Sequence, residues 1–299
     1  MSQEFELSII TINYNGLEDT CQMLSSLSLG GVSAQVIVID NGSSTDETSV
    51  IKMRFPWVEV YATHSNLGFA GGNNVGISKA LGRYLFFVNN DTDLSQCDFR
   101  LMINRMEKDQ SIGGLSPLIR FYQQPQAIQY AGYTKLSPIT LRNHAIGFGE
   151  TDEMAYQTER VTPYLHGAAM LVRSDVIRQV GVMPELYFLY YEELDWSVSM
   201  CNHGYKLLFA PLSVVFHKES QSTGADSPLK LYYVTRNRFL FSRRNNSLIC
   251  HLFACLYLLS VVIPKHTLKL LFQHRFIHLK YMYMAVGDYF SGKYGHLKK

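Results

Sequence analysis

Residues 83–94 read Arg-Tyr-Leu-Phe-Phe-Val-Asn-Asn-Asp-Thr-Asp-Leu, and this stretch decides the fold. Residues 84–88 are an apolar run of β-favouring side chains, and two carboxylates, Asp91 and Asp93, follow directly. The pattern is typical of a buried strand that delivers acidic side chains to its open end. Two carboxylates spaced in this way suit Mg²⁺ or Mn²⁺, which take oxygen ligands and leave positions free for phosphates. Taken alone, Asp-Thr-Asp also fits an ordinary solvated turn, because such short acidic motifs often arise by chance.

Three further apolar runs precede this strand, and helical patterns separate them. The runs lie at residues 7–12, 35–39 and 58–62. Strands that are apolar throughout and alternate with helices indicate an α/β fold with a mostly parallel sheet covered on both faces. Ligands bind such sheets at the carboxyl ends of the strands, where Asn13, Asp40 and Asp91 fall.

The second half of the chain also carries local patterns. A helix is predicted at residues 95–111 and another at 174–180. Extended segments are predicted at residues 113–122, 164–172, 205–210 and 213–216. Residues 123–162 lose the pattern and are interpreted as a variable loop that contacts the acceptor. His217 follows the last strand; a lone histidine is more often structural, but this one leaves a strand end in a chain that already favours a metal.

A segment dense in glycine and asparagine lies between the third and fourth strands, at residues 66–76. Glycine lets a backbone approach a ligand, and a helix that begins near Phe69 would direct free N–H groups at an anion. The segment matches neither a P-loop nor a dinucleotide-binding motif. Tight helix packing explains the glycines equally well, so the two interpretations stay open.

A second acidic cluster lies among aromatic residues at 187–196. Glu192 and Asp195 would share a helix face, whereas Glu193 would point about a quarter turn away. Carboxylates packed among tyrosine and tryptophan rings should have a raised pKa, which suits a general base near neutral pH. The alternative is an acidic first helical turn that the helix dipole favours.

Composition divides the chain into an acidic body and a basic end. The chain has 299 residues, 47% of them hydrophobic, which is enough for a catalytic domain with an appendage. Residues 1–215 contain 14 Lys and Arg against 22 Asp and Glu, whereas residues 216–299 contain 13 against 3. Five scattered cysteines indicate neither a disulfide framework nor a zinc site and favour a reducing compartment. The first residues lack a signal-peptide pattern, so a cytoplasmic location is expected.

The basic end contains an almost wholly apolar run at residues 248–263. It is shorter than the ~20 residues needed to span a bilayer, and Pro264 is expected to end it. With Lys269, Arg275 and Lys280 nearby, the run predicts an interfacial helix on the anionic inner leaflet. A helical subdomain packed on the core is the alternative. Nucleic-acid binding is not expected, because no known module appears and the front of the chain is acidic.

Together these segments resemble the inverting family 2 glycosyltransferases of the GT-A fold, in particular their bacterial rhamnosyltransferase-like branch. The resemblance extends from residue 7 to residue 238 and rests on five separated signatures in the same order. It implies a GT-A, Rossmann-like α/β fold: a mixed, mostly parallel sheet flanked by helices, with a C-terminal helical extension. The expected domains are a catalytic domain at 1–225, divided near residue 95 into nucleotide-sugar and acceptor halves, and a basic helical region at 226–299.

The resemblance also implies roles for individual residues. Residues expected to line the nucleotide-sugar site are Thr11, Asn13, Asp40, Asn41, Asn66, Gly68, Gly71, Asn74, Asn90, Asp91, Gly167 and Ala168. Those expected to hold Mg²⁺ or Mn²⁺ are Asp91, Asp93 and His217. Glu193 takes the position of the catalytic base, with Glu192 and Asp195 as alternatives. The sequence departs from the family at Glu193, where Asp is usual, and at Asn90, where Pro is frequent.

The function implied by the resemblance is inverting transfer of a sugar from a dTDP- or UDP-sugar. L-Rhamnose from dTDP-rhamnose is the first choice, and the acceptor would be a hydroxyl of a glycan or lipid-linked intermediate in bacterial surface polysaccharide synthesis, such as O-antigen, capsule or exopolysaccharide. A UDP-hexose or UDP-galactofuranose transferase of the same fold is an alternative, as is a non-catalytic nucleotide-sugar-binding protein. Expected partners are the nucleotide sugar, the acceptor and the inner leaflet, where the protein would be peripheral; a homodimer is left open.

Overall fold

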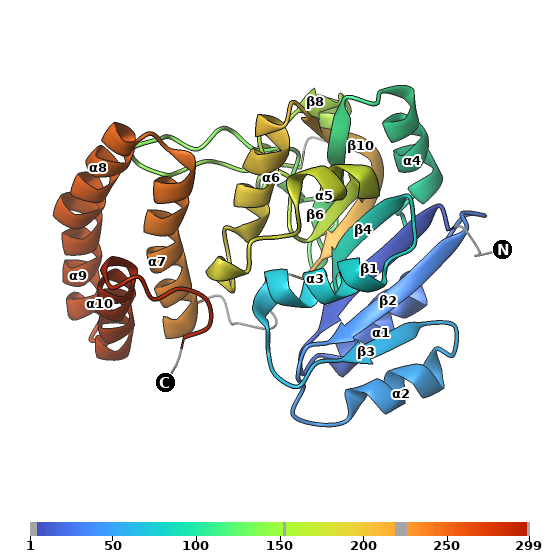
Figure 1. The fold of residues 1–299 in the computed structure, drawn as a ribbon, viewed down its shortest axis with the longest axis horizontal. Coiled ribbons are helices and arrows are strands. Elements are labelled where there is room, and N and C mark those ends of the chain that lie inside the picture. Colours follow the sequence, from blue (N-terminus) through green and yellow to red (C-terminus); the bar gives the residue numbers. More distant parts are fainter. Residues whose placement is uncertain (1–4, 152–153, 219–225, 298–299) are drawn as a thin grey trace.

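The computed structural model describes residues 5–151, 154–218 and 226–297. A ten-stranded sheet carries helices on both faces, and the C-terminal helices form a separate group beside it (Figure 1). The main path of the sheet has the strand order β3-β2-β1-β4-β9-β6-β10-β5, while β7 pairs with β6 and β8 with β10. The mixed, mostly parallel sheet predicted from the sequence is therefore confirmed.

The first four long strands are parallel, as the apolar runs predict. The strands are β1 (Leu7–Asn13), β2 (Ala34–Asp40), β3 (Glu59–Ala62) and β4 (Tyr84–Asn89), joined by α1 (Leu17–Ser26), α2 (Glu47–Arg54) and α3 (Gly68–Lys79). Alternate side chains enter two separate cores: Ile9 packs into one and Ile10 into the other, both fully buried. Burial on both faces explains why β1, β2 and β4 read as continuous apolar runs, whereas the short strand β3 is only partly buried.

The other half of the sheet mixes directions. Its elements are β5 (Thr92–Asp93), α4 (Phe99–Lys108), β6 (Ile112–Phe121), β7 (Ile128–Tyr130), η1 (Met154–Tyr156), β8 (Arg160–Val161), β9 (Ala169–Arg173), α5 (Ser174–Val180), η2 (Glu185–Tyr187), α6 (Glu192–Asn202) and β10 (Lys206–His217). Strand β9 runs antiparallel between β4 and β6, and β10 runs parallel to β6. The end of β10 then pairs with β5, directly after β4.

Several predicted boundaries are wrong, for local reasons. The strand predicted at 164–172 begins only at Ala169, because the backbone N–H of Ala169 donates to His166 O (3.1 Å) and closes a tight bend around Gly167. The helix predicted at 95–111 begins only after Asp98, whose carboxylate accepts from the Leu101 backbone N–H at 2.9 Å. The strand pair predicted at 205–216 is one strand, β10, with an irregularity between Phe209 and Val214.

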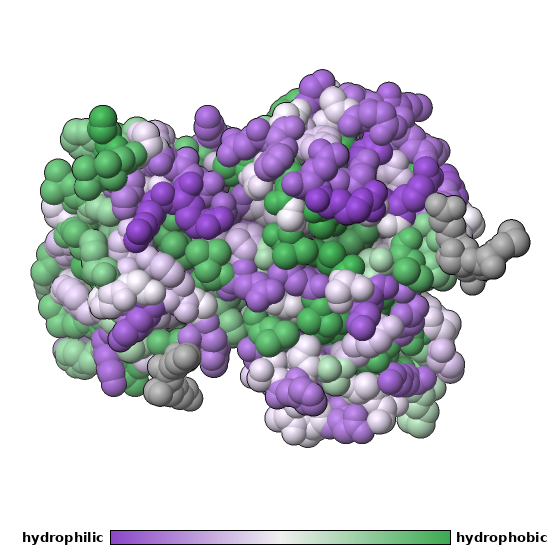
Figure 2. Space-filling model, viewed as in Figure 1, coloured by the Kyte–Doolittle hydropathy of each residue, from purple (hydrophilic) through white to green (hydrophobic). Residues whose placement is uncertain are grey.

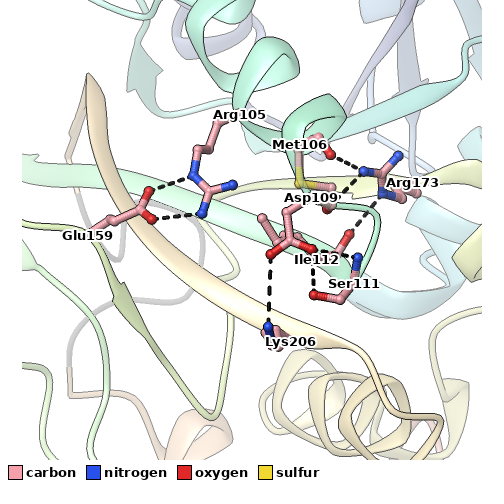
Figure 3. Close-up of polar contacts among 8 residues, drawn as sticks. All are labelled: Arg105, Met106, Asp109, Ser111, Ile112, Glu159, Arg173 and Lys206. Carbon is pink, nitrogen blue, oxygen red and sulfur yellow. Dashed lines mark hydrogen bonds and ion pairs between the residues drawn. The ribbon is translucent and has the colours of Figure 1, made fainter.

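A polar network fastens the end of the sheet that lies opposite the parallel strands' carboxyl ends (Figure 3). Arg173, the last residue of β9, buries its guanidinium and donates to the backbone carbonyls of Ile112 (2.9 Å) and Met106. Arg105 on α4 pairs with Glu159, just before β8, with an Nε–Oε2 distance of 2.7 Å. The loop predicted at 123–162 is therefore tied to the sheet and contains β7 and β8.

The C-terminal region consists of helices, as expected. They are α7 (Pro228–Asn245), α8 (Leu248–Tyr257), the π-helical turn η3 (Leu258–Val262), α9 (Ile263–Phe272) and α10 (Phe276–Phe290). Residues 219–225, at the predicted domain boundary, lie outside the described residues. In Figure 1 α7 lies on the side of the group that faces α6.

Helices α8 and α9 join through η3 into one helix, Leu248–Phe272, so the end predicted at Pro264 is wrong. Proline lacks an N–H and its ring crowds the carbonyl four residues earlier; the wider π turn immediately before Pro264 relieves that crowding. The helix has 25 residues, and its most apolar 18-residue window has a mean hydropathy of 2.0, which by length and composition is enough to cross a membrane. The prediction of a run too short to span is therefore corrected.

Candidate active site

The sheet topology brings Asp91 and His217 together. Strand β4 ends at Asn89, the chain turns, and Thr92 pairs with His217 at the end of β10. The Oδ1 atom of Asp91 lies 3.2 Å from Nε2 of His217, and both side chains are buried. Asp91 Oδ1 has no hydrogen-bond partner among the residues that the structure describes. Two residues more than a hundred positions apart in sequence thus face each other at the carboxyl end of the sheet.

The orientation of His217 is fixed by Gln129 on β7. His217 Nδ1 lies 2.9 Å from Gln129 Oε1. An amide oxygen only accepts, so Nδ1 carries a proton and Nε2 is the ring nitrogen that faces Asp91. Two electron-rich atoms in this position require a proton or a cation between them. Adjacent ligands of an octahedral Mg²⁺ are separated by ~3.0 Å for bonds of ~2.1 Å, so the spacing of the pair fits such an ion.

Asp93, the third predicted metal ligand, lies in a different position. Its Oδ1 accepts from the backbone N–H (2.9 Å) and the hydroxyl (2.5 Å) of Ser95. Among the described residues, no three His, Cys, Asp or Glu side chains gather closely enough to hold a metal ion. The structure therefore brings together two of the three predicted ligands, and Asp93 could join them only if its carboxylate moves.

The ends of β1 and β4 are joined by a buried polar network. Asn13 donates to Glu47 Oε2 (2.7 Å) and accepts from the Thr20 hydroxyl (2.7 Å). Asn90 donates to Thr20 Oγ1 at 3.0 Å, so Thr20 joins the two predicted asparagines. Near them, Thr11 is fully buried and its hydroxyl has no partner among the described residues. Asn13 and Asn90 thus shape the sheet end, and their predicted contact with the nucleotide stays a prediction.

The turn after β2 connects to the glycine- and asparagine-rich segment. Asp40 accepts from the Ser43 backbone N–H at 2.9 Å. The Asn41 amide donates to Asn66 Oδ1 (3.2 Å) and to the carbonyl of Gly68 (3.1 Å). These bonds place all four predicted residues at one strand end, as the sequence predicts for a ligand site.

Glycine at the start of α3 is required by close packing. Gly68 has a φ of +76°, and a Cβ there would lie 2.1 Å from the carbonyl oxygen of Phe188. A Cβ on Gly71 would lie 2.7 Å from that of Leu67. Asn74 bonds through its amide to the backbone of Met183 in both directions (2.9 and 3.0 Å). The packing interpretation of this segment is thus correct for Gly68 and Gly71, and α3 is fastened to the loop that precedes the acidic helix.

The segment at residues 166–168 separates the two acidic clusters. The His166 ring lies 6.3 Å from the His217 ring, and the carbonyl of Ala168 accepts from the backbone N–H of Asn89 (3.1 Å). On the other side, a Cβ on Gly167 would lie 3.6 Å from Cγ of Glu193. Burial and the neighbouring His217 lower the pKa of His166 to about 3. Residues 166–168 therefore lie between the cluster around Asp91 and the cluster around Glu193.

The acids of α6 have shifted pKa values, as the aromatic surroundings predict. Burial raises the pKa of Glu193 to about 7. Burial and the charge of Glu193 raise the pKa of Glu192 well above its ordinary value. Glu192 is 2% exposed and its Oε2 has no partner among the described residues, whereas Glu193 stays partly accessible. Burial thus favours the neutral form of Glu192, and Glu193 can exchange a proton near neutral pH.

Asp195, the third acid, is bound by α7. Its carboxylate accepts from Arg244 Nε and from the Asn245 amide, the latter at 3.1 Å. An acid that is buried and paired in this way orients α6 against α7. These contacts hold Asp195 against α7, and its assignment as an alternative base stays a prediction.

The loop before α6 is held in a strained conformation by Asn237 on α7. Phe188, Tyr190 and Tyr191 have φ values of +67°, +68° and +80°, the left-handed region that non-glycine residues rarely adopt. The Asn237 amide donates to the carbonyls of Tyr187, Leu189 and Tyr190 at 2.8–3.0 Å. Each left-handed residue costs roughly 1–2 kcal/mol, so the amide stabilises a loop that would otherwise relax.

We expect Asn237→Leu to lower the free energy of unfolding by about 2–4 kcal/mol, because it leaves buried carbonyls unpaired beside strained residues. Urea unfolding followed by tryptophan fluorescence measures this, since Trp196 lies on α6. Asn246→Leu is the matched control: it removes an amide that bonds the Pro138 carbonyl at an exposed position. Equal effects of the two substitutions would contradict the role given to Asn237.

Sequence reasoning missed four residues that shape this site. They are Asn89, Gln129, Asn237 and Arg244, none of which belongs to an acidic or glycine-rich motif. Gln129 lies within the stretch that lacks a pattern, and the other three act through contacts distant in sequence. The one available signal is the placement of Asn89 at a predicted strand end.

Comparison with known proteins identifies the family that this arrangement belongs to. The family model described as "Glycosyl transferase family 2" matches residues 8–181. The chain is 26% identical over 263 residues to the N-acetylglucosaminyl-diphospho-decaprenol L-rhamnosyltransferase of Mycobacterium tuberculosis, covering 79% of this chain and 83% of that protein. It is 24% identical over 252 residues to the low-salt glycan biosynthesis hexosyltransferase Agl10 of Haloferax volcanii, covering 79% and 75%.

Two solved structures share the fold. The mannosyltransferase PcManGT from Pyrobaculum calidifontis, in complex with GDP-Man and Mn²⁺, has a TM-score of 0.56 at 12% identity and covers 98% of this chain and 89% of that one. GalNAc-T7 with UDP, GalNAc and Mn²⁺ has a TM-score of 0.59 at 17% identity and covers 79% of this chain. This chain spans about half (48%) of the GalNAc-T7 chain. The predicted GT-A fold is confirmed by these neighbours.

Proposed function

The chain belongs to glycosyl transferase family 2, and from this premise we propose that it is an inverting, metal-dependent glycosyltransferase. Glu193 takes the proton of an acceptor hydroxyl, whose oxygen forms a bond to the anomeric carbon of the donor sugar. The bond from that carbon to the nucleoside diphosphate breaks on the opposite face, which inverts the anomeric configuration. The observation that carries the proposal is a carboxylate of pKa about 7 placed across residues 166–168 from the Asp91–His217 pair.

Asp91 and His217 would hold Mg²⁺ or Mn²⁺, with Asp93 as a third ligand if its carboxylate moves toward them. The bound ion would supply positive charge that stabilises the departing diphosphate. The unpartnered Oδ1 of Asp91 supports this assignment, as does the fixed ring of His217. Mn²⁺ in the two fold neighbours supports the kind of ion.

For the donor we propose L-rhamnose from dTDP-rhamnose, and for the acceptor a lipid-linked glycan of bacterial surface polysaccharide synthesis. The mycobacterial relative supports both choices, since its name specifies an L-rhamnosyl group and a decaprenol-linked N-acetylglucosamine diphosphate. A hexose is the second candidate, because the Haloferax relative is named a hexosyltransferase.

A donor panel with a polyprenyl diphosphate N-acetylglucosamine acceptor tests the proposal. With Mn²⁺, we expect turnover of dTDP-rhamnose to exceed that of UDP-glucose, UDP-galactose and UDP-galactofuranose by at least about tenfold, as pocket contacts discriminate sugars. EDTA should abolish turnover. The preferred donor should also raise Tm, since a bound ligand stabilises the folded state. A donor that raises Tm but is never transferred would instead indicate a non-catalytic nucleotide-sugar-binding protein.

We also propose that the C-terminal helices attach the enzyme peripherally to the cytoplasmic leaflet of the inner membrane. Only 22% of the most apolar window in Leu248–Phe272 is buried, and Figure 2 shows hydrophobic residues along the outer edge of this group. The exposed apolar side chains, here called the outer face, are Leu248, Ile249, Leu252, Phe253, Leu256, Leu259, Val261, Leu268, Leu271, Phe272, Phe276 and Ile277. Exposed Lys265, Lys269 and Lys280 lie among them, as an anionic lipid surface requires.

The double substitution Leu252→Glu and Leu256→Glu should lower binding to vesicles by about 10- to 100-fold, because each places a charge where an apolar side chain would enter the lipid. Flotation with vesicles that contain phosphatidylglycerol measures the bound fraction. The pair Met53→Glu and Trp57→Glu is the control, since these residues are exposed and apolar but belong to the sheet domain. A wild-type protein that stays with the soluble fraction would contradict the attachment.

A further inference from the structure

His166 lies at the centre of the site, yet neither the general base nor the metal ligands account for it. Its backbone N–H donates to Ser116 Oγ at 3.0 Å. Its ring stacks on the Tyr133 ring, with centroids 5.8 Å apart and an interplanar angle of 8°, and it also packs against Tyr130 at 5.0 Å. The ring of His217 contacts another side of it. Three aromatic neighbours therefore fix the plane of the His166 ring.

The hydrogen bonds of His166 determine which nitrogen carries its proton. Nδ1 accepts from the backbone N–H of Ala168 at 3.1 Å. An imidazole nitrogen that accepts a hydrogen bond carries no proton, so the ring is the neutral tautomer with its proton on Nε2. Nε2 has no hydrogen-bond partner among the residues that the structure describes. It is also not one of the unpartnered polar atoms that are completely buried, so it keeps some accessible surface. His166 thus keeps one oriented N–H donor for a ligand.

His166 lies between the two groups of side chains that the proposed reaction uses. On one side is the Asp91–His217 pair, whose histidine ring is 6.3 Å from that of His166. On the other is Glu193, which lies against the adjacent residue, Gly167. If the proposed function holds, the anomeric carbon and the leaving diphosphate lie between the Asp91–His217 pair and Glu193. An N–H group in that space meets oxygen atoms of the nucleotide sugar.

We propose that Nε2–H of His166 donates a hydrogen bond to an oxygen of the nucleotide-sugar donor, and that His166 is a donor-binding residue. Both possible sources of that oxygen, the diphosphate and a hydroxyl of the transferred sugar, accept hydrogen bonds. The inference rests on the proposed function for its substrate. It adds a neutral donor group, which can bind an oxygen without competing with Glu193 for the proton of the acceptor.

Two substitutions separate the two nitrogens of the ring. In His166→Asn the amide oxygen can replace Nδ1 as the acceptor for the Ala168 N–H, but no group reaches the position of Nε2. In His166→Gln the longer side chain carries its NH₂ group to about the position of Nε2 and leaves the Ala168 N–H unpaired. A donor-binding role predicts that kcat/KM falls about 10- to 100-fold in His166→Asn and less than about fivefold in His166→Gln. A structural role through Nδ1 predicts the reverse order.

The outcomes decide the proposal even if one variant folds poorly. Tm is measured for each, and His166→Asn alone suffices: a tenfold loss of kcat/KM at unchanged Tm supports the donor role, and wild-type activity overturns it. Equal losses in both variants at unchanged Tm also overturn it.

A binding experiment tests His166 even if the wild type transfers no sugar, a result that would overturn the proposed function. Calorimetry measures the binding of dTDP and of dTDP-rhamnose in the presence of Mn²⁺. Weaker binding of both ligands to His166→Asn identifies the diphosphate as the source, weaker binding of dTDP-rhamnose alone identifies the sugar, and unchanged binding of both overturns the inference.

Discussion

Replacing Glu193 with Gln should lower kcat about 10²- to 10⁴-fold, the usual contribution of a general base. The amide keeps the size of the side chain but cannot accept the proton of the acceptor hydroxyl. Binding of the nucleotide sugar should change little, because the Asp91–His217 pair proposed to bind the diphosphate through a metal ion lies on the other side of residues 166–168. Stopped sugar-transfer assays give kcat, and calorimetry with the unreacted donor gives Kd.

Glu192→Gln is the matched control for this experiment. Glu192 is buried and its pKa is raised well above the ordinary value, which favours the neutral acid that the amide resembles. We expect kcat to fall by less than about tenfold. Normal turnover of Glu193→Gln together with an inactive Glu192→Gln would reverse the assignment and make Glu192 the base.

The pKa of Glu193 also sets a pH dependence. A base must be ionised, so kcat/KM should rise with pH and level off above the pKa of about 7. Because the folded-state pKa lies above the ordinary value of 4.5, ionisation costs stability, and the free energy of unfolding should fall between these two values as pH rises. A pH–rate profile that is flat from pH 5 to 8 would contradict Glu193 as the base.

Asp91→Asn should reduce activity about 10²- to 10³-fold at a fixed Mn²⁺ concentration, because it removes the only charge of the Asp91–His217 pair when the ring is neutral. Tm in EDTA shows whether the variant keeps its fold in the absence of the ion. Titration of activity and of calorimetric heat with Mn²⁺ measures the loss of metal affinity. Wild-type activation by Mn²⁺ in this variant would remove Asp91 from the proposed site.

A milder companion to this variant is Gln129→Leu, which removes the acceptor that fixes Nδ1 of His217. Loss of such an outer partner typically weakens metal binding about 10- to 100-fold. The order expected for Mn²⁺ affinity is therefore wild type, Gln129→Leu and Asp91→Asn. An unchanged affinity in Gln129→Leu would show that the ring holds its orientation without that bond.

Much of the fold could be predicted from local patterns. Strands β1, β2, β3 and β4 were expected within a residue or two of their observed ends. Three of them, β1, β2 and β4, are buried on both faces and are followed by polar residues. The polar residues at the strand ends, among them Asp40 and Asp91, were expected at one edge for the same reason. The raised pKa values of Glu192 and Glu193 were also expected, because aromatic residues surround this part of the sequence.

The remaining features depend on contacts that no local pattern records. Asp93 turns to Ser95 although its spacing from Asp91 suggests a shared ligand, because a backbone N–H two residues ahead is the nearer partner. Gln129 is one polar residue in a loop, and only the pairing of β7 with β6 places it beside His217. Proline is a reliable helix terminator in sequence, yet Pro264 is accommodated by a change of helix type.

The hydrogen bonds from Asn237 and Arg244 to residues 187–195 limit which segments this protein can exchange with its relatives in a chimera. The family model ends at residue 181, before the proposed base Glu193, so the matched part of the fold and the C-terminal helices meet at residues 185–195. A chimera joined near residue 225 would pair α7 of one protein with the acidic loop of another and lose the register of these bonds. Residues 185–195 and the helices after residue 227 must therefore be inherited together, as a single unit of exchange.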